Sequence, residues 1–76
     1  MALTLLFLGR LQDAAGGEER TVGYHRDLAA LIASLEPELG QALRSDKVRV
    51  AVNGVLGVTV LADGDEVAFL PPVSGG

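Results

Sequence analysis

The chain lacks cysteine and tryptophan altogether, and it has only one histidine, one tyrosine and two phenylalanines among its 76 residues. Without cysteine there is no disulfide bond, no thiolate metal ligand and no thiol nucleophile. The lone histidine, His25, has no serine, carboxylate or second histidine at a catalytic spacing, so we interpret it as a residue at a strand end. We therefore expect no metal site in this chain.

Basic residues are also scarce. The chain has six lysines and arginines and ten aspartates and glutamates, which gives a net charge of −4. Because an acidic chain with scattered basic residues repels phosphate backbones, we expect no nucleic-acid binding and favour docking on a basic partner surface. Arg10 and Arg49 are interpreted as solvated side chains, either of which could pair with a partner.

Long hydrophobic segments are missing as well. The apolar run Leu3–Leu8 is far shorter than the ~20 residues that span a bilayer. It also lacks the basic flank and the small-residue cleavage site of a signal peptide. We expect a cytoplasmic protein without a membrane segment.

Seventy-six residues suffice for one small domain, which buries only ~60% of the surface that its unfolded chain exposes. The 49% of hydrophobic residues supply a core but leave no room for a deep, enclosed active site beside it. A self-sufficient enzyme is therefore not expected.

The apolar pattern predicts two strands followed by a helix. Residues 3–8 and 20–25 have the composition of strands, with the turn signal Gly16-Gly17 between them. Asp27 is suited to cap a helix whose apolar face has the spacing i, i+3, i+4, i+7, formed by Leu28, Leu31, Ile32 and Leu35. Pro37 should end that helix, and residues 38–44 have the pattern of a further helical turn.

The second half of the chain is predicted to be mainly strand. Residues 48–52 alternate and lead into Asn53-Gly54, the strongest short hairpin signal. We expect residues 55–61 to form a short returning strand or an irregular crossing, followed by a turn and the last strand, residues 66–70. This order predicts an α+β fold of the ubiquitin-like β-grasp type, in which one main helix crosses one face of a mixed sheet of four to five strands. We expect residues 1–70 to form this domain and residues 71–76 an extended tail.

The first strand predicts an apolar patch on the sheet face away from the helix. If Leu3, Leu5 and Phe7 face the helix, the alternate side chains face outward. An exposed apolar patch commonly marks an interaction site, although a covering loop would remove it. We assign partner binding to Leu6, Leu8, Ala51, Phe69 and Leu70.

The last six residues combine two rigid prolines with mostly small residues: Pro71, Pro72, Val73, Ser74, Gly75 and Gly76. The two prolines favour extended backbone, so the tail could reach roughly 20 Å at ~3.3 Å per residue. Glycine has no Cβ, so a carboxylate on Gly76 could enter a partner's active site. A carboxylate is a poor electrophile, and a partner must supply ATP to activate it. A frayed terminus is the simpler alternative.

Three stretches of the chain resemble the small subunits of molybdopterin synthase, a family of ubiquitin-like sulfur carriers. They are Leu6-Phe7-Leu8-Gly9-Arg10-Leu11, then Val50-Ala51-Val52-Asn53-Gly54, and most specifically Asp63-Gly64-Asp65-Glu66-Val67-Ala68-Phe69-Leu70-Pro71-Pro72-Val73-Ser74-Gly75-Gly76. A terminal Gly-Gly alone is shared with ubiquitin and with the related carrier of thiamine synthesis. One departure is the segment 53–63, which is shorter and less polar than expected in the family.

The resemblance implies a non-catalytic sulfur-donor role. An adenylating enzyme of the ubiquitin-activating type would use ATP to convert Gly76 to an acyl-adenylate, and a sulfur donor would then form a C-terminal thiocarboxylate. Residues 71–75 would insert into the large synthase subunit, where the sulfur is transferred to cyclic pyranopterin monophosphate. No cofactor would be bound stably by the chain itself. A carrier for thiamine or tRNA thiolation, or a ubiquitin-like modifier, is the alternative.

Overall fold

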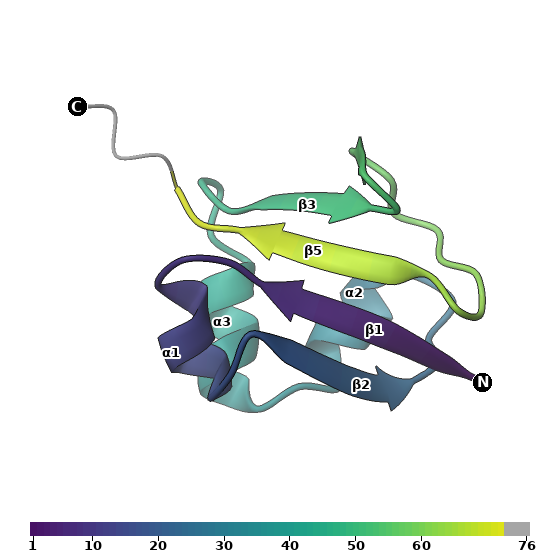
Figure 1. Ribbon diagram of the computed structural model, residues 1–76, viewed down its shortest axis with the longest axis horizontal. Coiled ribbons are helices and arrows are strands. Elements are labelled where there is room, and N and C mark those ends of the chain that lie inside the picture. The colour runs from purple at the N-terminus through teal and green to yellow at the C-terminus, as the bar shows by residue number, and fades with distance from the viewer. Residues whose placement is uncertain (73–76) are drawn as a thin grey trace.

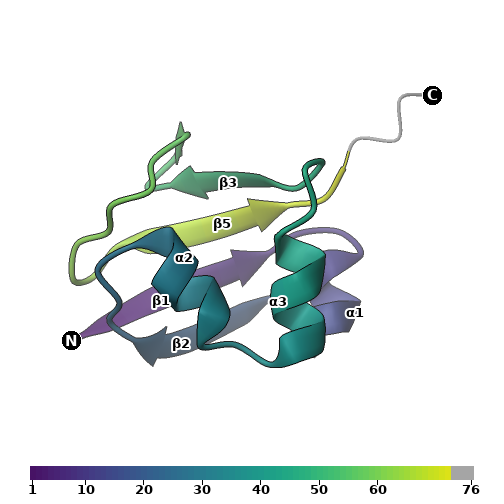
Figure 2. The ribbon, with the colours of Figure 1, turned by 180° about the vertical axis from the view of Figure 1, so that it is seen from behind.

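In the computed structural model, which describes residues 1–72, five strands form one mixed sheet and three short helices pack beside it (Figures 1 and 2). The strand order is β2-β1-β5-β3-β4, and the central pair β1 and β5 is parallel while the other pairs are antiparallel. This is the expected β-grasp arrangement. The elements are β1 (Ala2–Phe7), α1 (Leu11–Ala15), β2 (Glu19–Gly23), α2 (Leu28–Ala33), α3 (Pro37–Leu43), β3 (Arg49–Val52), β4 (Val55–Leu56) and β5 (Glu66–Leu70).

The helices differ from the single main helix expected. Asp27 caps α2 as predicted, since its Oδ1 accepts the N–H of Ala30 at 2.8 Å. Helix α2 has only six residues, and Pro37 starts the seven-residue α3 where a helical turn was expected. Proline fits the first turn of a helix, whereas the preceding Glu36 is held in extended backbone, so the chain breaks between two helices. The five-residue α1 was not predicted.

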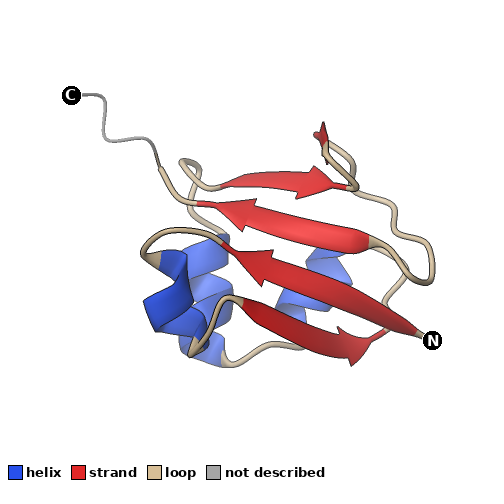
Figure 3. Cartoon of the chain, viewed as in Figure 1, coloured by secondary structure: helices blue, strands red, loops and turns tan. Residues whose placement is uncertain are grey.

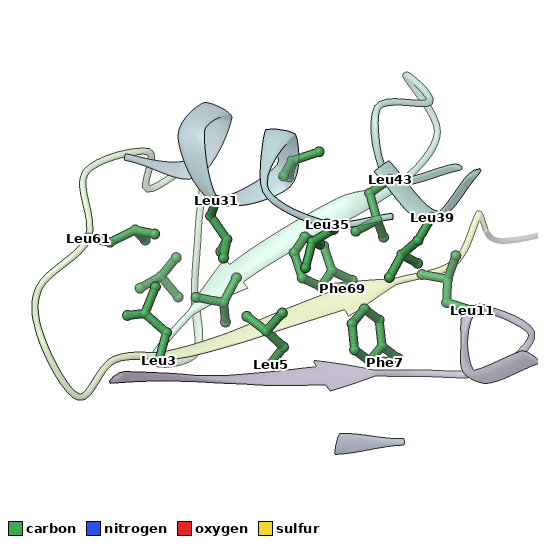
Figure 4. Close-up of a cluster of buried hydrophobic side chains, with 13 residues drawn as sticks. Leu3, Leu5, Phe7, Leu11, Leu31, Leu35, Leu39, Leu43, Leu61 and Phe69 are labelled. Atoms are coloured by element: carbon green, nitrogen blue, oxygen red, sulfur yellow. The ribbon is translucent and has the colours of Figure 1, made fainter. Parts of the chain in front are cut away.

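The helices and the sheet enclose one apolar core (Figure 4). Leu3, Leu5 and Phe7 on β1 all face it, as their alternation predicts. At its centre the rings of Phe7 and Phe69 stack with centroids 5.5 Å apart. Thirteen apolar side chains of residues 1–72 are buried here: Leu3, Leu5, Phe7, Leu11, Leu31, Ile32, Leu35, Leu39, Leu43, Val52, Leu61, Val67 and Phe69.

The β3–β4 hairpin forms where the Asn-Gly signal predicts it (Figure 3). Asn53 and Gly54 both have positive φ, 51° and 83°, as the tight turn between strands requires. The segment 55–61, expected as a short returning strand or an irregular crossing, begins as strand β4 and becomes irregular after Leu56, because Gly57 at φ 82° turns the chain away from β3. The backbone then bridges to Asp27 at Val60.

The start of β5 is fixed by side chains of the preceding turn. The Asp65 carboxylate accepts hydrogen bonds from the Ala62 N–H and the Asn53 side-chain amide, each at 2.8 Å. Asn53 Oδ1 in turn accepts the N–H of Glu66 at 3.0 Å. These bonds favour the charged carboxylate, so the Ala62 N–H first, and then Asn53, hold the pKa of Asp65 below its ordinary value.

This arrangement predicts a specific acid sensitivity. A carboxylate with a lowered folded-state pKa stabilises the fold above its unfolded pKa, and that contribution is lost as the pH falls through the folded pKa. Asp65→Asn should therefore lower the urea midpoint at pH 7, and its difference from wild type should shrink towards pH 2. Asp46→Asn, at an exposed loop carboxylate, is the matched control. A constant difference across the titration would refute this role of Asp65.

Candidate functional site

The base of the tail lies at the end of the central strand β5. Pro71 and Pro72 follow Leu70 directly, and both are half-buried. Residues Val73 to Gly76, which include the expected reactive glycine and most of the expected insertion segment, lie outside the described residues. The described part of the chain therefore defines where the tail begins.

One side of this base is braced by the turn after β1. The Leu8 N–H donates to the carbonyl oxygen of Phe69 at 3.1 Å, which continues the β1–β5 ladder by one bond. Gly9 follows with φ 56°, and a Cβ built on it would lie 2.9 Å from Cγ of Pro71. Only glycine fits this conformation and this close contact without a shift. The turn after β1 therefore lies directly against the first residue of the tail.

The other side of the base is polar. Asp46, Lys47 and Arg49 line a shallow groove together with Pro71 and Pro72. Arg49 is the first residue of β3 and lies directly across from Leu70 in the antiparallel β3–β5 register. The tail therefore begins between the turn after β1 and a charged groove.

The sheet face away from the helices, here called the outer face, has a continuous apolar row. In the strand register Leu6 lies beside Ala68, Ala68 beside Ala51, and Ala51 beside Leu56. This apolar row crosses four strands. Figure 1 shows the outer face towards the viewer, with no described element over it. The alternative of a covering loop is thus wrong for residues 1–72.

The apolar row continues towards the tail through Leu8 and Leu70. Leu8 is 39% exposed and Leu70 is half-buried. Leu6, Leu8, Ala51 and Leu70 therefore lie together on one accessible surface, as their alternation predicts. An accessible apolar surface of this kind is typical of an interaction site.

Phe69 is a correction to the expected partner-binding set. Its side chain is fully buried and stacks on Phe7, because inward and outward positions alternate along β5. Leu56 is the residue that the sequence analysis missed: it is 64% exposed and completes the apolar row. The Asn53-Gly54 hairpin could have revealed it, since a two-residue turn sets Leu56 across from Ala51.

Metal-binding clusters and membrane-spanning helices are not seen in residues 1–72. No cluster of three or more His, Asp or Glu side chains there could hold a metal ion. Nor does that part of the chain contain a helix with the length and apolar character needed to cross a membrane. His25 lies between β2 and α2, away from the tail base.

Comparisons with known proteins match nearly the whole chain. The model of the ThiS family matches residues 5–76. The molybdopterin synthase sulfur carrier subunit of Mycobacterium tuberculosis (strain ATCC 25618 / H37Rv) is 36% identical over 81 aligned residues, covering 97% of this chain and 96% of that protein.

Solved structures agree in fold. A chain in the complex of subunits 1 and 2 of the molybdopterin-converting factor from Helicobacter pylori 26695 is 30% identical with a TM-score of 0.71, and the match covers 100% of both chains. The small archaeal modifier protein 1 from Methanosarcina acetivorans is 25% identical with a TM-score of 0.80, covering 99% of this chain and 96% of that chain.

The Gly9–Pro71 contact is tested by a pair of alanine substitutions. Gly9→Ala and Gly16→Ala both place a Cβ at positive φ, which costs about 1–2 kcal/mol. Only Gly9→Ala also forces Pro71 to move, because nothing lies within 4 Å of a Cβ at Gly16. Urea unfolding should show about 1 kcal/mol more loss for Gly9→Ala, and its NMR spectrum should shift at Leu70 and Pro71. Equal losses of stability in the two variants, without chemical-shift changes at Leu70 and Pro71, would disprove that Gly9 packs against Pro71.

Proposed function

The chain belongs to the ThiS family, and from this premise we propose that it is the sulfur-carrier subunit of molybdopterin synthase. The observation that carries the proposal is the 36% identity, over almost the full length of both chains, to the sulfur carrier subunit from M. tuberculosis. The tail sequence Pro71-Pro72-Val73-Ser74-Gly75-Gly76 supports it as well.

In this proposal Gly76 is the reacting residue. Its carboxylate attacks the α-phosphorus of ATP in an adenylating enzyme, and pyrophosphate leaves. Sulfide delivered by a sulfur donor then attacks the acyl carbon of the adenylate and displaces AMP, which leaves a thiocarboxylate on Gly76. This activation is needed because a free carboxylate resists nucleophilic attack, whereas AMP is a good leaving group.

The tail would deliver this sulfur inside the large subunit. There the thiocarboxylate sulfur would displace an oxygen substituent of cyclic pyranopterin monophosphate to form a thioester, and water would hydrolyse this thioester, which leaves the sulfur on the precursor and returns the carrier to the carboxylate form. Gly75 and Gly76 carry no side chains, so a narrow channel can admit them, while Pro71 and Pro72 favour an extended approach. The Gly9–Pro71 contact supports the proposal because it packs the first residue of the tail against the folded domain.

The outer face would dock the large subunit. The H. pylori relative is found in a complex of two subunits, which supports a large-subunit partner for this chain. The apolar row and the tail base are continuous through Leu8 and Leu70, so one partner surface can cover both. Burial of such apolar side chains contributes about 25 cal/mol per Å² of apolar area removed from water.

A ubiquitin-like modifier is the second candidate, and the likeness to the small archaeal modifier protein 1 favours it. Both routes begin with adenylation of Gly76, but a modifier ends in an amide bond to a lysine of another protein. Carriers for thiamine or tRNA thiolation share the thiocarboxylate and differ in the acceptor. The chemical state of Gly76 therefore separates the modifier from the carriers, and the acceptor separates the carriers from each other.

Intact mass spectrometry of the chain from cells with its own sulfur-transfer enzymes tests the carrier chemistry. We expect a gain of about sixteen mass units, because one sulfur replaces one oxygen at Gly76. Deletion of Gly75 and Gly76 should abolish the gain while the circular dichroism spectrum stays unchanged. A full gain in the deletion variant would contradict the proposal, and mass added to a target lysine instead would favour the modifier.

Substitutions on the outer face test the docking surface. Leu6→Gln and Leu70→Gln each place an amide in the proposed interface. Each should raise the dissociation constant for the large subunit about tenfold, which is the effect expected for a residue that contributes significantly to an interface. Thr21→Gln, on the outer face but outside the apolar row, is the control and should bind as wild type does. Urea midpoints should stay near wild type in all three. Normal binding combined with unfolding would mean that Leu6 and Leu70 belong to the core.

A further inference from the structure

Charge is unevenly distributed around the apolar row. Lys47 and Arg49, here called the basic pair, line the groove at Pro71 and Pro72, and Arg49 lies across from Leu70 at the tail end of β5. Both residues are exposed. Asp46 lines the same groove and offsets part of their charge. This corner of an acidic chain is therefore locally basic.

Acidic residues lie elsewhere on the outer face, away from the basic pair. Glu66 is at the opposite end of β5, beside Thr4. Glu19 is on the edge strand β2, across from Leu6. Glu66 and Leu70 are four residues apart on one strand, which corresponds to about 14 Å at ~3.4 Å per residue. The outer face is thus polarised along β5, from acidic at its start to basic where the tail begins.

The basic pair forms no ion pair within the described fold. Among residues 1–72 the ion pair is that of Arg20 with Glu36, at 2.7 Å, and neither Lys47 nor Arg49 takes part in one. Exposed side chains without a local partner contribute little to stability but act at a distance through the protein's field. Their position beside the tail base gives them access to any surface that surrounds the tail.

We propose that the basic pair recognises carboxylates of the large subunit at the mouth of the channel that admits the tail. This inference rests on the proposed function. With the acidic end of β5 opposite it, the basic pair makes the face electrostatically asymmetric, so the encounter is favoured in the orientation that points the tail into the channel. Such complementarity mainly raises the association rate and selects the orientation.

Carboxylates of a protein fit this position better than the phosphates of a nucleotide. The basic pair flanks Pro71 and Pro72, whereas activation would take place at Gly76. An extended chain from Pro72 to Gly76 spans roughly 13 Å at ~3.3 Å per residue, so the activated end would be remote from Lys47 and Arg49. The groove would instead meet the rim of whichever surface the tail enters.

Charge reversal with a matched control tests this inference. Lys47→Glu and Arg49→Glu, and Arg26→Glu as the control, change the net charge equally, and Arg26 is an exposed residue of the loop between β2 and α2. Association with the purified large subunit encoded in the same genome is followed by stopped-flow fluorescence. At low salt each reversal in the basic pair should lower the association rate about tenfold, and at ~0.5 M salt the effect should nearly vanish. Arg26→Glu should change the rate less than twofold.

The outcomes separate this inference from the proposed function. If wild type binds the large subunit and Arg26→Glu slows association as much as the two reversals do, net charge alone acts and the basic pair has no special role. Unchanged rates for Lys47→Glu and Arg49→Glu overturn the inference in the same way. If wild type itself fails to bind, the proposed function fails and the inference falls with it. Circular dichroism of each variant checks that the fold is retained.

Discussion

The parallel pairing of β1 with β5 is the constraint on which the other features depend. Its register places Phe7 beside Phe69 in the core and Leu6 beside Ala68 on the outer face. Because side chains alternate along a strand, a slip of one residue would bury the outer side chains and expose the stacked phenylalanines. The cost of exposing those rings, each worth about 2–3 kcal/mol of burial, holds the register. The same pairing brings Gly9 close to Pro71, so one strand register sets both the outer face and the start of the tail.

This dependence separates the two faces of the sheet into a buried face and an accessible face. The core uses the inward face of the sheet and the helices, which leaves the outer face free to contact a partner. The tail begins at the central strand, so a partner seated on the outer face also surrounds the tail base. In the proposed function the body supplies affinity and orientation, and Gly76 supplies the reacting group. Catalysis then belongs to the partner enzymes.

The sequence predicts those parts of the fold and the outer face that depend on residues close together in the chain. Alternation along residues 3–7 gave the inward and outward side chains, Asp27 capped its helix, and Asn53-Gly54 formed its hairpin. Each of these depends on neighbours within a few residues. The assignment of Phe69 to the partner surface was wrong even though the same alternation places it inward.

The rest depended on contacts between distant parts of the chain. Helix α1 has only five residues, too few for a periodic signal, and is held by the burial of Leu11 in the core. The Gly9–Pro71 contact joins residues more than sixty positions apart and leaves no local pattern. Leu56 entered the apolar row through strand pairing, since β4 is only two residues long. The polarised outer face likewise required the register of β3 with β5.

The most direct test of the central claim is a single-turnover reaction with chain that carries a thiocarboxylate at Gly76. It is mixed with the purified large subunit and cyclic pyranopterin monophosphate, and the intact mass of the chain is followed with time. The account predicts a loss of about sixteen mass units that requires both the large subunit and the precursor, as sulfur leaves and the carboxylate returns. A mass that stays constant in the complete mixture, while the two proteins bind, would contradict it.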